Sequence, residues 1–296
     1  HLCLVGTSAT VKGIMPKQIL STNSEIILCN TYHLMLKPGR NIIEKFGGIN
    51  NFMNWKKPIL SDSGGFQVMS LSPLAKVSDQ GVNFKSHIDG KNIFLSPEEC
   101  INLQVIFDVD IAMVLDECTP YPVDYQTAQN SMLRSMNWAK RCKQAWPSRP
   151  GKGLFGIVQG GIYKDLRIES LNRLKDIDFD GYAIGGLAVG EGQREMLRVL
   201  KYTSDLLPFE KPRYLMGVGK PDDIVKAVLE GIDMFDCVLP TRSGRTGQAF
   251  TRAGPINIRN ACFSDDTSPL DESIPFSVSN NFSKAYVHHL FKSKEI

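Results

Sequence analysis

The sequence has no apolar run of the ~18 residues that a membrane-spanning helix needs, and no charged-then-apolar leader opens it. Its seven cysteines are odd in number, scattered and never in a C-x-x-C pair, which argues against a disulfide framework. A strong excess of either charge is also lacking, since the formal net charge is only +3. A nucleic-acid partner would therefore need a local basic patch. We expect a cytoplasmic protein without membrane contact.

Short apolar runs bounded by Gly, Pro or Asp alternate with helix-patterned stretches, which is typical of parallel strands joined by helical crossovers. Eight such runs occur, at 2–5, 26–30, 59–62, 112–116, 154–159, 182–186, 214–218 and 234–239. Eight parallel strands close a barrel, and 296 residues can build one in a single domain. The sequence therefore predicts an α/β fold, a (β/α)8 TIM barrel over 1–296.

Helix starts and two interruptions refine this prediction. Ser96, Asp124 and Pro221 each stand at the start of a stretch with helical spacing of apolar residues. The segment 77–95 has alternating runs around Asp89-Gly90, which predicts an inserted β-hairpin. The segment 241–296 predicts an irregular subdomain, with an alternating run at 255–259 and a last helix near 283–292. Because His1 leads straight into an apolar run, we expect the chain to start inside a longer gene product.

Three aspartates stand at the carboxyl ends of predicted strands, where the catalytic groups of this fold gather. Asp62 ends the third run, Asp116 ends the fourth, and Asp236 lies within the eighth. Structural alternatives exist, since Asp62 would also cap a turn and Asp116 would also cap a helix or form an ion pair. Asp236 is costly to bury inside an apolar run without a partner or a function. Convergence at one mouth favours the functional interpretation.

Two carboxylates that flank an anomeric carbon serve retaining glycosyl transfer, one as nucleophile and the other as acid/base. Asp236 and Asp62 are the candidate pair. Asp116 remains to accept hydrogen bonds from the N–H edge of a purine, with Phe66 and Met216 stacked on its two faces. Glycine pairs after the fifth and sixth runs serve close packing or let a flat ligand rest on backbone amides. The pocket predicts a base attached to a ribose.

Six ordered strings resemble the blocks of bacterial tRNA-guanine transglycosylases, also called queuine tRNA-ribosyltransferases. They are SDSGGFQVMSL, LDECTPYP, GIVQGG, YAIGGLAVGE, RYLMGVGKP and MFDCVLPTRSGRTGQAF. The similarity extends from Val5 to His289. It implies a TIM-barrel pentosyltransferase that exchanges the wobble guanine of a tRNA for a deazaguanine base during queuosine biosynthesis.

The resemblance assigns roles residue by residue. Asp236 is implied as the nucleophile that attacks the ribose carbon of a flipped-out wobble nucleotide, and Asp62 as the general acid/base for the leaving and incoming bases. The implied base-binding residues are Asp116 and Gln159 at the base edge, Gly186 through its N–H, Leu187 through its carbonyl, and Phe66 with Met216 as a sandwich.

Base choice and partners also follow from the resemblance. Cys118 and Val189 match bacterial members that take 7-aminomethyl-7-deazaguanine, whereas queuine-using members differ at both positions. Arg242 and Arg245 match positions that hold the tRNA anticodon loop, although two arginines on a Gly/Ser-rich loop are also compatible with a solvated loop. Catalytic members are usually homodimers, so a homodimer is expected.

The zinc site of the family is where this sequence departs most. Members hold a structural zinc through a C-x-C-x-x-C cluster and a later histidine, but Ile274, Phe276 and Ser279 stand at the three cysteine positions. Ile and Phe do not bind zinc and serine is a poor ligand. We therefore expect no zinc and no other cofactor, and a degenerate zinc-type subdomain in a sequence truncated at both ends.

Two rival functions remain open at this point. A catalytically impaired tRNA-binding relative or decayed copy would keep the fold but lose base exchange. A sugar-processing TIM-barrel enzyme would need aromatic platforms and polar groups for hydroxyls, which the predicted strand ends do not offer. Incorporation of labelled guanine into tRNA separates the first rival from an active enzyme.

Overall fold

The computed structural model describes residues 1–71, 75–274 and 278–295. The chain divides into two compact units, His1–Cys237 and Val238–Ile296. The first unit contains all of the predicted barrel, and the second contains the segment for which the sequence predicts an irregular subdomain. None of the helices in the described residues is long and apolar enough to cross a membrane.

The first unit is a closed barrel of eight parallel strands, in the order β1-β11-β10-β9-β8-β7-β3-β2. Each strand lies within or overlaps one of the eight predicted apolar runs, so the predicted TIM barrel is confirmed. All four residues in each of β2, β3 and β9 are buried, as expected for strands covered on both faces. The strands are β1 (Leu2–Val5), β2 (Ile27–Asn30), β3 (Ile59–Asp62), β7 (Ile111–Met113), β8 (Gly153–Val158), β9 (Gly181–Ile184), β10 (Arg213–Leu215) and β11 (Met234–Cys237).

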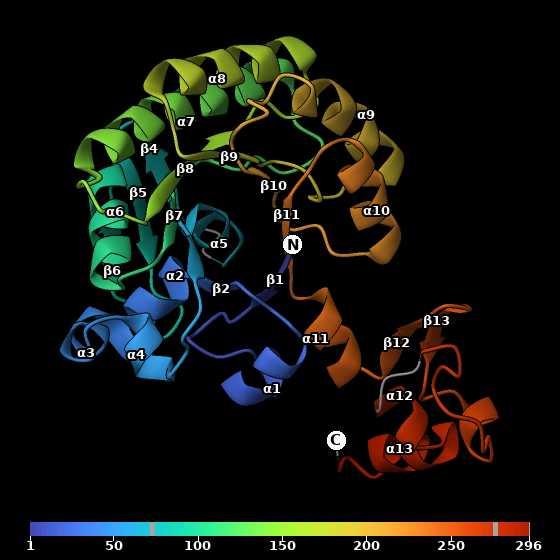
Figure 1. Cartoon of the computed structure of the whole chain (residues 1–296). Coiled ribbons are helices and arrows are strands. Elements are labelled where there is room, and N and C mark those ends of the chain that lie inside the picture. Colours follow the sequence, from blue (N-terminus) through green and yellow to red (C-terminus); the bar gives the residue numbers. More distant parts are fainter. Residues whose placement is uncertain (72–74, 275–277, 296) are drawn as a thin grey trace. The chain divides into compact units, whose positions relative to one another are not determined.

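Helices cover the outside of these strands, and α6 to α10 form an arc around β7 to β11 (Figure 1). Their starts follow from capping: the Ser96 hydroxyl accepts from the Glu99 N–H at 3.2 Å, and Asp124 accepts from the Thr127 N–H at 2.9 Å. Pro221 occupies the first turn of its helix. The later crossovers are α6 (Pro97–Ile106), α7 (Tyr125–Ala145), α8 (Lys164–Ile177), α9 (Gln193–Ser204) and α10 (Pro221–Leu229).

The early crossovers are shorter and more irregular. Helix α1 connects β1 to β2, and a chain of short helical segments connects β2 to β3, because Gly and Pro interrupt the sequence there. The segments are α1 (Pro16–Ser21), α2 (Thr31–Leu34), η1 (Met35–Gly39), α3 (Arg40–Lys45), α4 (Ile49–Met53) and, after β3, α5 (Gly65–Leu71). Helix α5 begins directly at the carboxyl end of β3 and so belongs to the mouth of the barrel.

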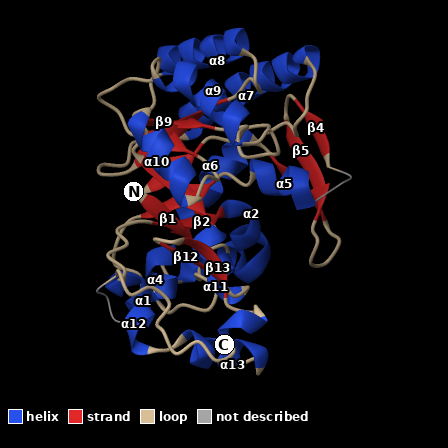
Figure 2. Cartoon of the chain, turned by 90° about the vertical axis from the view of Figure 1, so that its right-hand side faces the viewer, coloured by secondary structure: helices blue, strands red, loops and turns tan. Residues whose placement is uncertain are grey.

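An antiparallel sheet of three strands is inserted between α5 and α6. Its strands β4 and β5 are labelled at the right-hand edge of Figure 2. The predicted hairpin is confirmed as β5 (Gly81–Lys85) and β6 (Asn92–Leu95), and β4 (Lys76–Ser78) adds a third strand. The Asp89-Gly90 turn lies inside a longer loop, because the last paired residues are Lys85 and Asn92.

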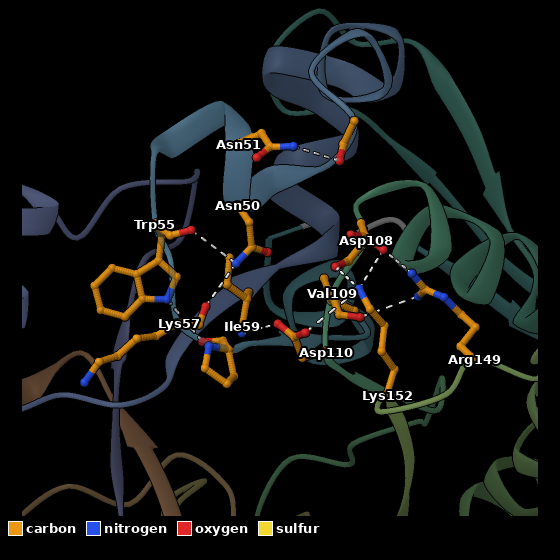
Figure 3. A network of polar contacts seen from close by, with 12 residues as sticks. Asn50, Asn51, Trp55, Lys57, Ile59, Asp108, Val109, Asp110, Arg149 and Lys152 are labelled. Carbon is orange, nitrogen blue, oxygen red and sulfur yellow. Dashed lines mark hydrogen bonds and ion pairs between the residues drawn. The ribbon is translucent and has the colours of Figure 1, made fainter.

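Aspartates at the amino-terminal ends of the barrel strands accept backbone hydrogen bonds in a repeated pattern. Each stands one residue before a strand and accepts a backbone N–H from the neighbouring strand, as in Asp110 with Ile59 (2.8 Å), Asp180 with Leu154 (2.9 Å) and Asp233 with Arg213 (2.9 Å). Around Asp110, Lys152 contacts both Asp110 and Asp108, and Arg149 bonds to Asp108 (Figure 3). These bonds satisfy strand N–H groups that have no ladder partner. The acidic residues of this rim therefore serve the fold.

The second unit begins with α11 (Leu239–Arg245) and continues into a β-hairpin and short helices. Its hairpin strands β12 (Gln248–Thr251) and β13 (Gly254–Asn257) are antiparallel, as the alternating run at 255–259 predicts in part. The last helix, α13 (Lys284–Lys292), is capped by Ser283 as expected. The remaining elements are η2 (Ala261–Phe263) and α12 (Val278–Asn281).

Candidate active site

The three predicted aspartates meet at the carboxyl ends of the barrel strands. Asp62 is the last residue of β3, Asp116 follows β7, and Asp236 lies in β11. Burial raises the pKa of both Asp116 and Asp236, and the charge of Asp62 raises both further. Because the strands are parallel in one closed barrel, their carboxyl ends lie at the same mouth, which brings the three carboxyl groups to one end of the barrel. The convergence that the sequence predicts is therefore present.

Asp62 is held on both of its oxygens. Its Oδ1 accepts the Gly64 N–H at 2.7 Å, and its Oδ2 accepts from Asn30 Nδ2 at 2.9 Å and from Gln67 Nε2 at 2.7 Å. Asn30 is aligned with Asp62 in the β2–β3 ladder, so strand register places this donor. Burial raises the pKa of Asp62, while the bonds from Gly64, Gln67 and Asn30 lower it. The carboxyl group is fixed in position but still able to take up a proton.

Asp236 is held on one oxygen only. Its Oδ1 accepts from the Tyr214 hydroxyl at 2.6 Å and from the Gly217 N–H at 2.8 Å. Gly217 has φ of +75°, a backbone conformation that favours glycine. Among the described residues, Oδ2 of Asp236 accepts no hydrogen bond. One oxygen is thus anchored and the other is available to attack an electrophile.

Asp116 and Gln159 form a buried pair between neighbouring strand ends. Gln159 Nε2 donates to Asp116 Oδ2 at 2.6 Å, and the Gln159 backbone N–H donates to Ser170 Oγ at 3.1 Å. Burial raises the pKa of Asp116 to about 7, against the opposing bond from Gln159. A carboxyl group with this pKa changes its hydrogen-bonding capacity near neutral pH.

The base-binding role that the resemblance implies for Asp116 predicts that base recognition depends on pH. Only the carboxylate form of Asp116 accepts two N–H groups, so we expect the KM for guanine to rise as pH falls through about 7. Asp116→Ala should raise this KM at least about tenfold and remove its pH dependence, since an unpaired buried donor costs about 1–3 kcal/mol. Steady-state exchange kinetics on both sides of neutrality measure both effects. An identical pH profile in parent and variant would assign the role to another residue.

Glycines allow the pocket walls to approach these side chains closely. A Cβ at Gly65 would lie 2.4 Å from the Asp116 carbonyl oxygen, and one at Gly185 would lie 2.7 Å from Gln159 Nε2. A Cβ at Gly186 would lie 2.6 Å from Gln159 Oε1. These distances are too short for any side chain. A side chain at Gly65 would therefore collide with the Asp116 backbone, and one at Gly185 or Gly186 would press on the Gln159 amide that bonds to Asp116.

The loop after β9 carries three further predicted residues and is fixed by Glu191. The Glu191 carboxylate accepts the N–H of Ala188 at 2.6 Å and that of Val189 at 2.9 Å. A trans peptide directs its C=O opposite to its N–H, so the Leu187 carbonyl points away from Glu191. The Leu187 side chain itself is buried. The predicted use of its carbonyl is compatible with this geometry.

The other predicted pocket residues occupy partly exposed positions. Phe66 on α5 is 49% exposed, a high value for a phenylalanine. Met216, after β10, and Cys118, after β7, are half-buried. Burial raises the pKa of the Cys118 thiol to about 12, so this cysteine is neutral at physiological pH. A neutral thiol is a poor nucleophile, so Cys118 is not suited to that role.

The predicted RNA-binding and zinc positions lie in the second unit. Arg242 and Arg245 are on α11, and both side chains are exposed. At the expected zinc positions, the Ile274 carbonyl accepts from Asn280 Nδ2 at 2.7 Å and the Ser279 carbonyl accepts from the Leu270 N–H at 3.0 Å. Phe276 lies outside the described residues. In the part of the chain that is described, no group of three or more His, Cys, Asp or Glu could hold a metal ion.

Sequence reasoning missed the residues that hold these groups in place. Asn30 and Gln67 donate to Asp62, Tyr214 donates to Asp236, and Arg167 donates to the glycine loops. Strand register could have indicated Tyr214, because it stands opposite Met234 and therefore near Asp236 on the adjacent strand. Helical spacing could have indicated Arg167, because it shares the buried face of α8 with the residues three, four and seven positions later.

Comparison with known proteins identifies the family of the chain. The family model described as queuine tRNA-ribosyltransferase matches residues 1–296. A queuine tRNA-ribosyltransferase of Zymomonas mobilis subsp. mobilis is 58% identical over 296 residues, which cover 99% of this chain and 77% of the relative. Relatives of the same name from Jannaschia sp. and Rickettsia akari are 56% and 54% identical over 292 residues, and this chain covers 78% and 81% of them. The chain therefore belongs to the queuine tRNA-ribosyltransferase family.

Proposed function

We propose that the protein is a tRNA-guanine transglycosylase that replaces the wobble guanine at position 34 of queuosine-type tRNAs through a covalent ribosyl-aspartate intermediate. The observation that carries this assignment is the unequal hydrogen bonding of the two carboxyl groups. Asp236 has one oxygen without a hydrogen bond among the described residues, as a nucleophile requires. Asp62 has donors on both oxygens and a raised pKa, as a proton carrier requires.

The reaction has two symmetrical steps. Asp236 Oδ2 forms a bond to C1′ of the ribose while the bond from C1′ to the guanine nitrogen breaks, and Asp62 gives its proton to the departing guanine. The incoming base then attacks C1′, loses its proton to Asp62 and releases the Asp236 carboxylate. Two inversions retain the configuration at C1′. After both steps Asp236 is again a free carboxylate and Asp62 again carries its proton, so the proposed reaction needs no cofactor.

The proposed incoming base is 7-aminomethyl-7-deazaguanine. Cys118 and Val189 support this choice through the family pattern, and Asp116 with Gln159 offers a carboxylate and an amide to its guanine-like edge. Competition assays test it: 7-aminomethyl-7-deazaguanine should inhibit incorporation of labelled guanine at lower concentration than queuine does. A reversed order of the two bases would contradict the proposed specificity.

The proposed partners are the tRNA anticodon loop and a second copy of the chain, in the cytoplasm. The exposed guanidinium groups of Arg242 and Arg245 are suited to phosphate and base-edge contacts. Exposed Phe282 and Tyr286, whose ring centroids are 5.6 Å apart, form an apolar patch suited to a subunit contact. Sedimentation at several concentrations tests the homodimer.

Incorporation of labelled guanine into unmodified tRNA tests the function itself. We expect label in the RNA when protein, tRNA and guanine are incubated together, and none when the protein is omitted. Retention of tRNA without incorporation of label would instead identify a catalytically impaired tRNA-binding relative.

We propose that the second unit folds without the structural zinc of its family. Polar contacts among side chains and backbone connect the segment 266–284. Lys284 Nζ lies 3.4 Å from Asp266 and 2.8 Å from Ser268 Oγ, and Asn280 donates to the Ile274 carbonyl. Protein purified without added metal should contain well under one zinc per chain by elemental analysis. About one zinc per chain, retained through dialysis against a mild chelator, would refute this proposal.

A further inference from the structure

Arg167 is a buried cation whose hydrogen bonds within the described residues all go to backbone carbonyl groups. It lies in the first turn of α8 and is 1% exposed. Its Nε donates to the Gly161 carbonyl at 2.7 Å, and its Nη2 donates to the Gly185 carbonyl at 3.0 Å and more weakly to that of Gly186. Its Nη1 reaches the Val158 carbonyl at 3.4 Å. One guanidinium therefore joins the loop after β8 to the loop after β9.

The Glu191 carboxylate favours the charged form of this group from a distance but forms no ion pair with it. Within the described residues, Arg167 takes part in no ion pair, although a charge removed from water usually requires one. Burial lowers the pKa of Arg167 to about 10, so the group is still a cation at neutral pH. The planar, rigid fork of arginine suits simultaneous bonds to several carbonyls in a way that the ammonium group of lysine does not. A costly residue at this place indicates a requirement for defined loop geometry.

The bond to Gly185 determines where the next N–H points. In a trans peptide the C=O and the following N–H lie in one plane and point in opposite directions. Since the Gly185 carbonyl faces Arg167, the Gly186 N–H faces the other side of the loop. There it approaches the Cys118 thiol closely enough to oppose the effect of burial on the pKa of that group. Cys118 belongs to the predicted base pocket, so this N–H is directed into the pocket.

We propose that Arg167 is a positioning residue for base selectivity, because it directs the Gly186 N–H toward the carbonyl oxygen of a 6-oxopurine. This inference rests on the proposed base-exchange function. It assigns to Arg167 no contact with the substrate. Adenine carries an amino group at the same ring position and offers no acceptor there, so the oriented N–H discriminates between the two bases.

The test compares Arg167→Met and Arg167→Lys with Arg173→Met, which removes an exposed arginine from the same helix. For Arg167→Met we expect a rise in the KM for guanine of about tenfold or more, with the KM for tRNA within about twofold of the parent. The preference for guanine over adenine in competition should fall by a similar factor. Arg167→Lys should show a smaller loss of the same kind, and Arg173→Met should match the parent.

Direct binding of guanine, measured by calorimetry, separates this inference from the proposed function. If the parent binds guanine but does not exchange it, the function fails, while weaker guanine binding by Arg167→Lys still supports the positioning role. If Arg167→Met does not fold, as judged by its thermal transition, Arg167→Lys carries the test. Unchanged guanine affinity and unchanged selectivity in a folded Arg167 variant would overturn the inference. Equal losses for guanine and tRNA would overturn it as well.

Discussion

Replacing Asp236 by asparagine should reduce guanine exchange by at least roughly a thousandfold while tRNA still binds. The asparagine Oδ1 can keep the bonds from the Tyr214 hydroxyl and the Gly217 N–H, so the strand end should stay intact. Its amide nitrogen, which replaces the free oxygen, is not a nucleophile. Incorporation of labelled guanine measures the loss, and a filter-binding assay with tRNA measures the retained affinity.

The matched control is Asp205→Asn, which removes an exposed carboxylate after α9. It should exchange guanine at the parent rate. If Asp236→Asn exchanged guanine nearly as fast as the parent, Asp236 would not be the nucleophile. If the variant also lost tRNA binding and its thermal transition, Asp236→Glu would keep the charge and decide whether the position is catalytic, with a strong loss of exchange expected from the displaced oxygen.

Asp62→Asn should reduce exchange by about 10²–10⁴-fold, the usual contribution of a general acid/base. The structure can accommodate the new amide, because Gln67 Oε1 is buried without a partner among the described residues. Rotation of the Gln67 side-chain amide would present this oxygen to the amide nitrogen of the introduced asparagine, and the Asn30 amide, which also donates to Asp62 Oδ2, would have to rotate in the same way. The fold should therefore survive a change that removes only the proton carrier.

The pH profile distinguishes this role from a purely structural one. Burial raises the pKa of Asp62, and departure of guanine needs the protonated form. The exchange rate of the parent should therefore fall as pH rises through this pKa, and Asp62→Asn should lack this fall. Asp89→Asn, in the exposed loop between β5 and β6, is the control and should keep the parent profile. If the exchange rate of Asp62→Asn depended on pH in the same way as that of the parent, whatever its absolute value, the proton transfer would belong to another residue.

Local sequence signals were sufficient to predict the barrel. Strands buried on both faces read as continuous apolar runs, and Ser96, Asp124 and Pro221 fix helix starts through short-range capping. The residues beyond the strand ends were harder to assign, since the run at 112–116 continues past β7 at Met113. The boundary between the two compact units falls after Cys237, close to residue 241, where the sequence predicts that the irregular subdomain begins.

The site divides in the same way. The position of Asp62 and Asp116 at one mouth could be predicted because each ends an apolar run, and Asp236 stood out because an aspartate inside such a run is costly to bury. The residues that orient them were not evident, because their roles depend on contacts between distant segments. In the sequence, Tyr214 is part of an apolar run, and only the alignment of β10 with β11 places it near Asp236. Arg167 has the pattern of a solvated helix residue, and only the folded structure shows its bonds to the glycine loops.

The most direct test of the covalent mechanism is to locate the link between protein and RNA. The protein is mixed with unmodified tRNA in the absence of free base, denatured and digested with nuclease and protease, and the peptides are analysed by mass spectrometry. A nucleophilic Asp236 predicts a ribose joined through C1′ to the peptide that contains this residue, with no such adduct in Asp236→Asn. An adduct on Asp62, or guanine exchange at the parent rate without any adduct, would contradict it.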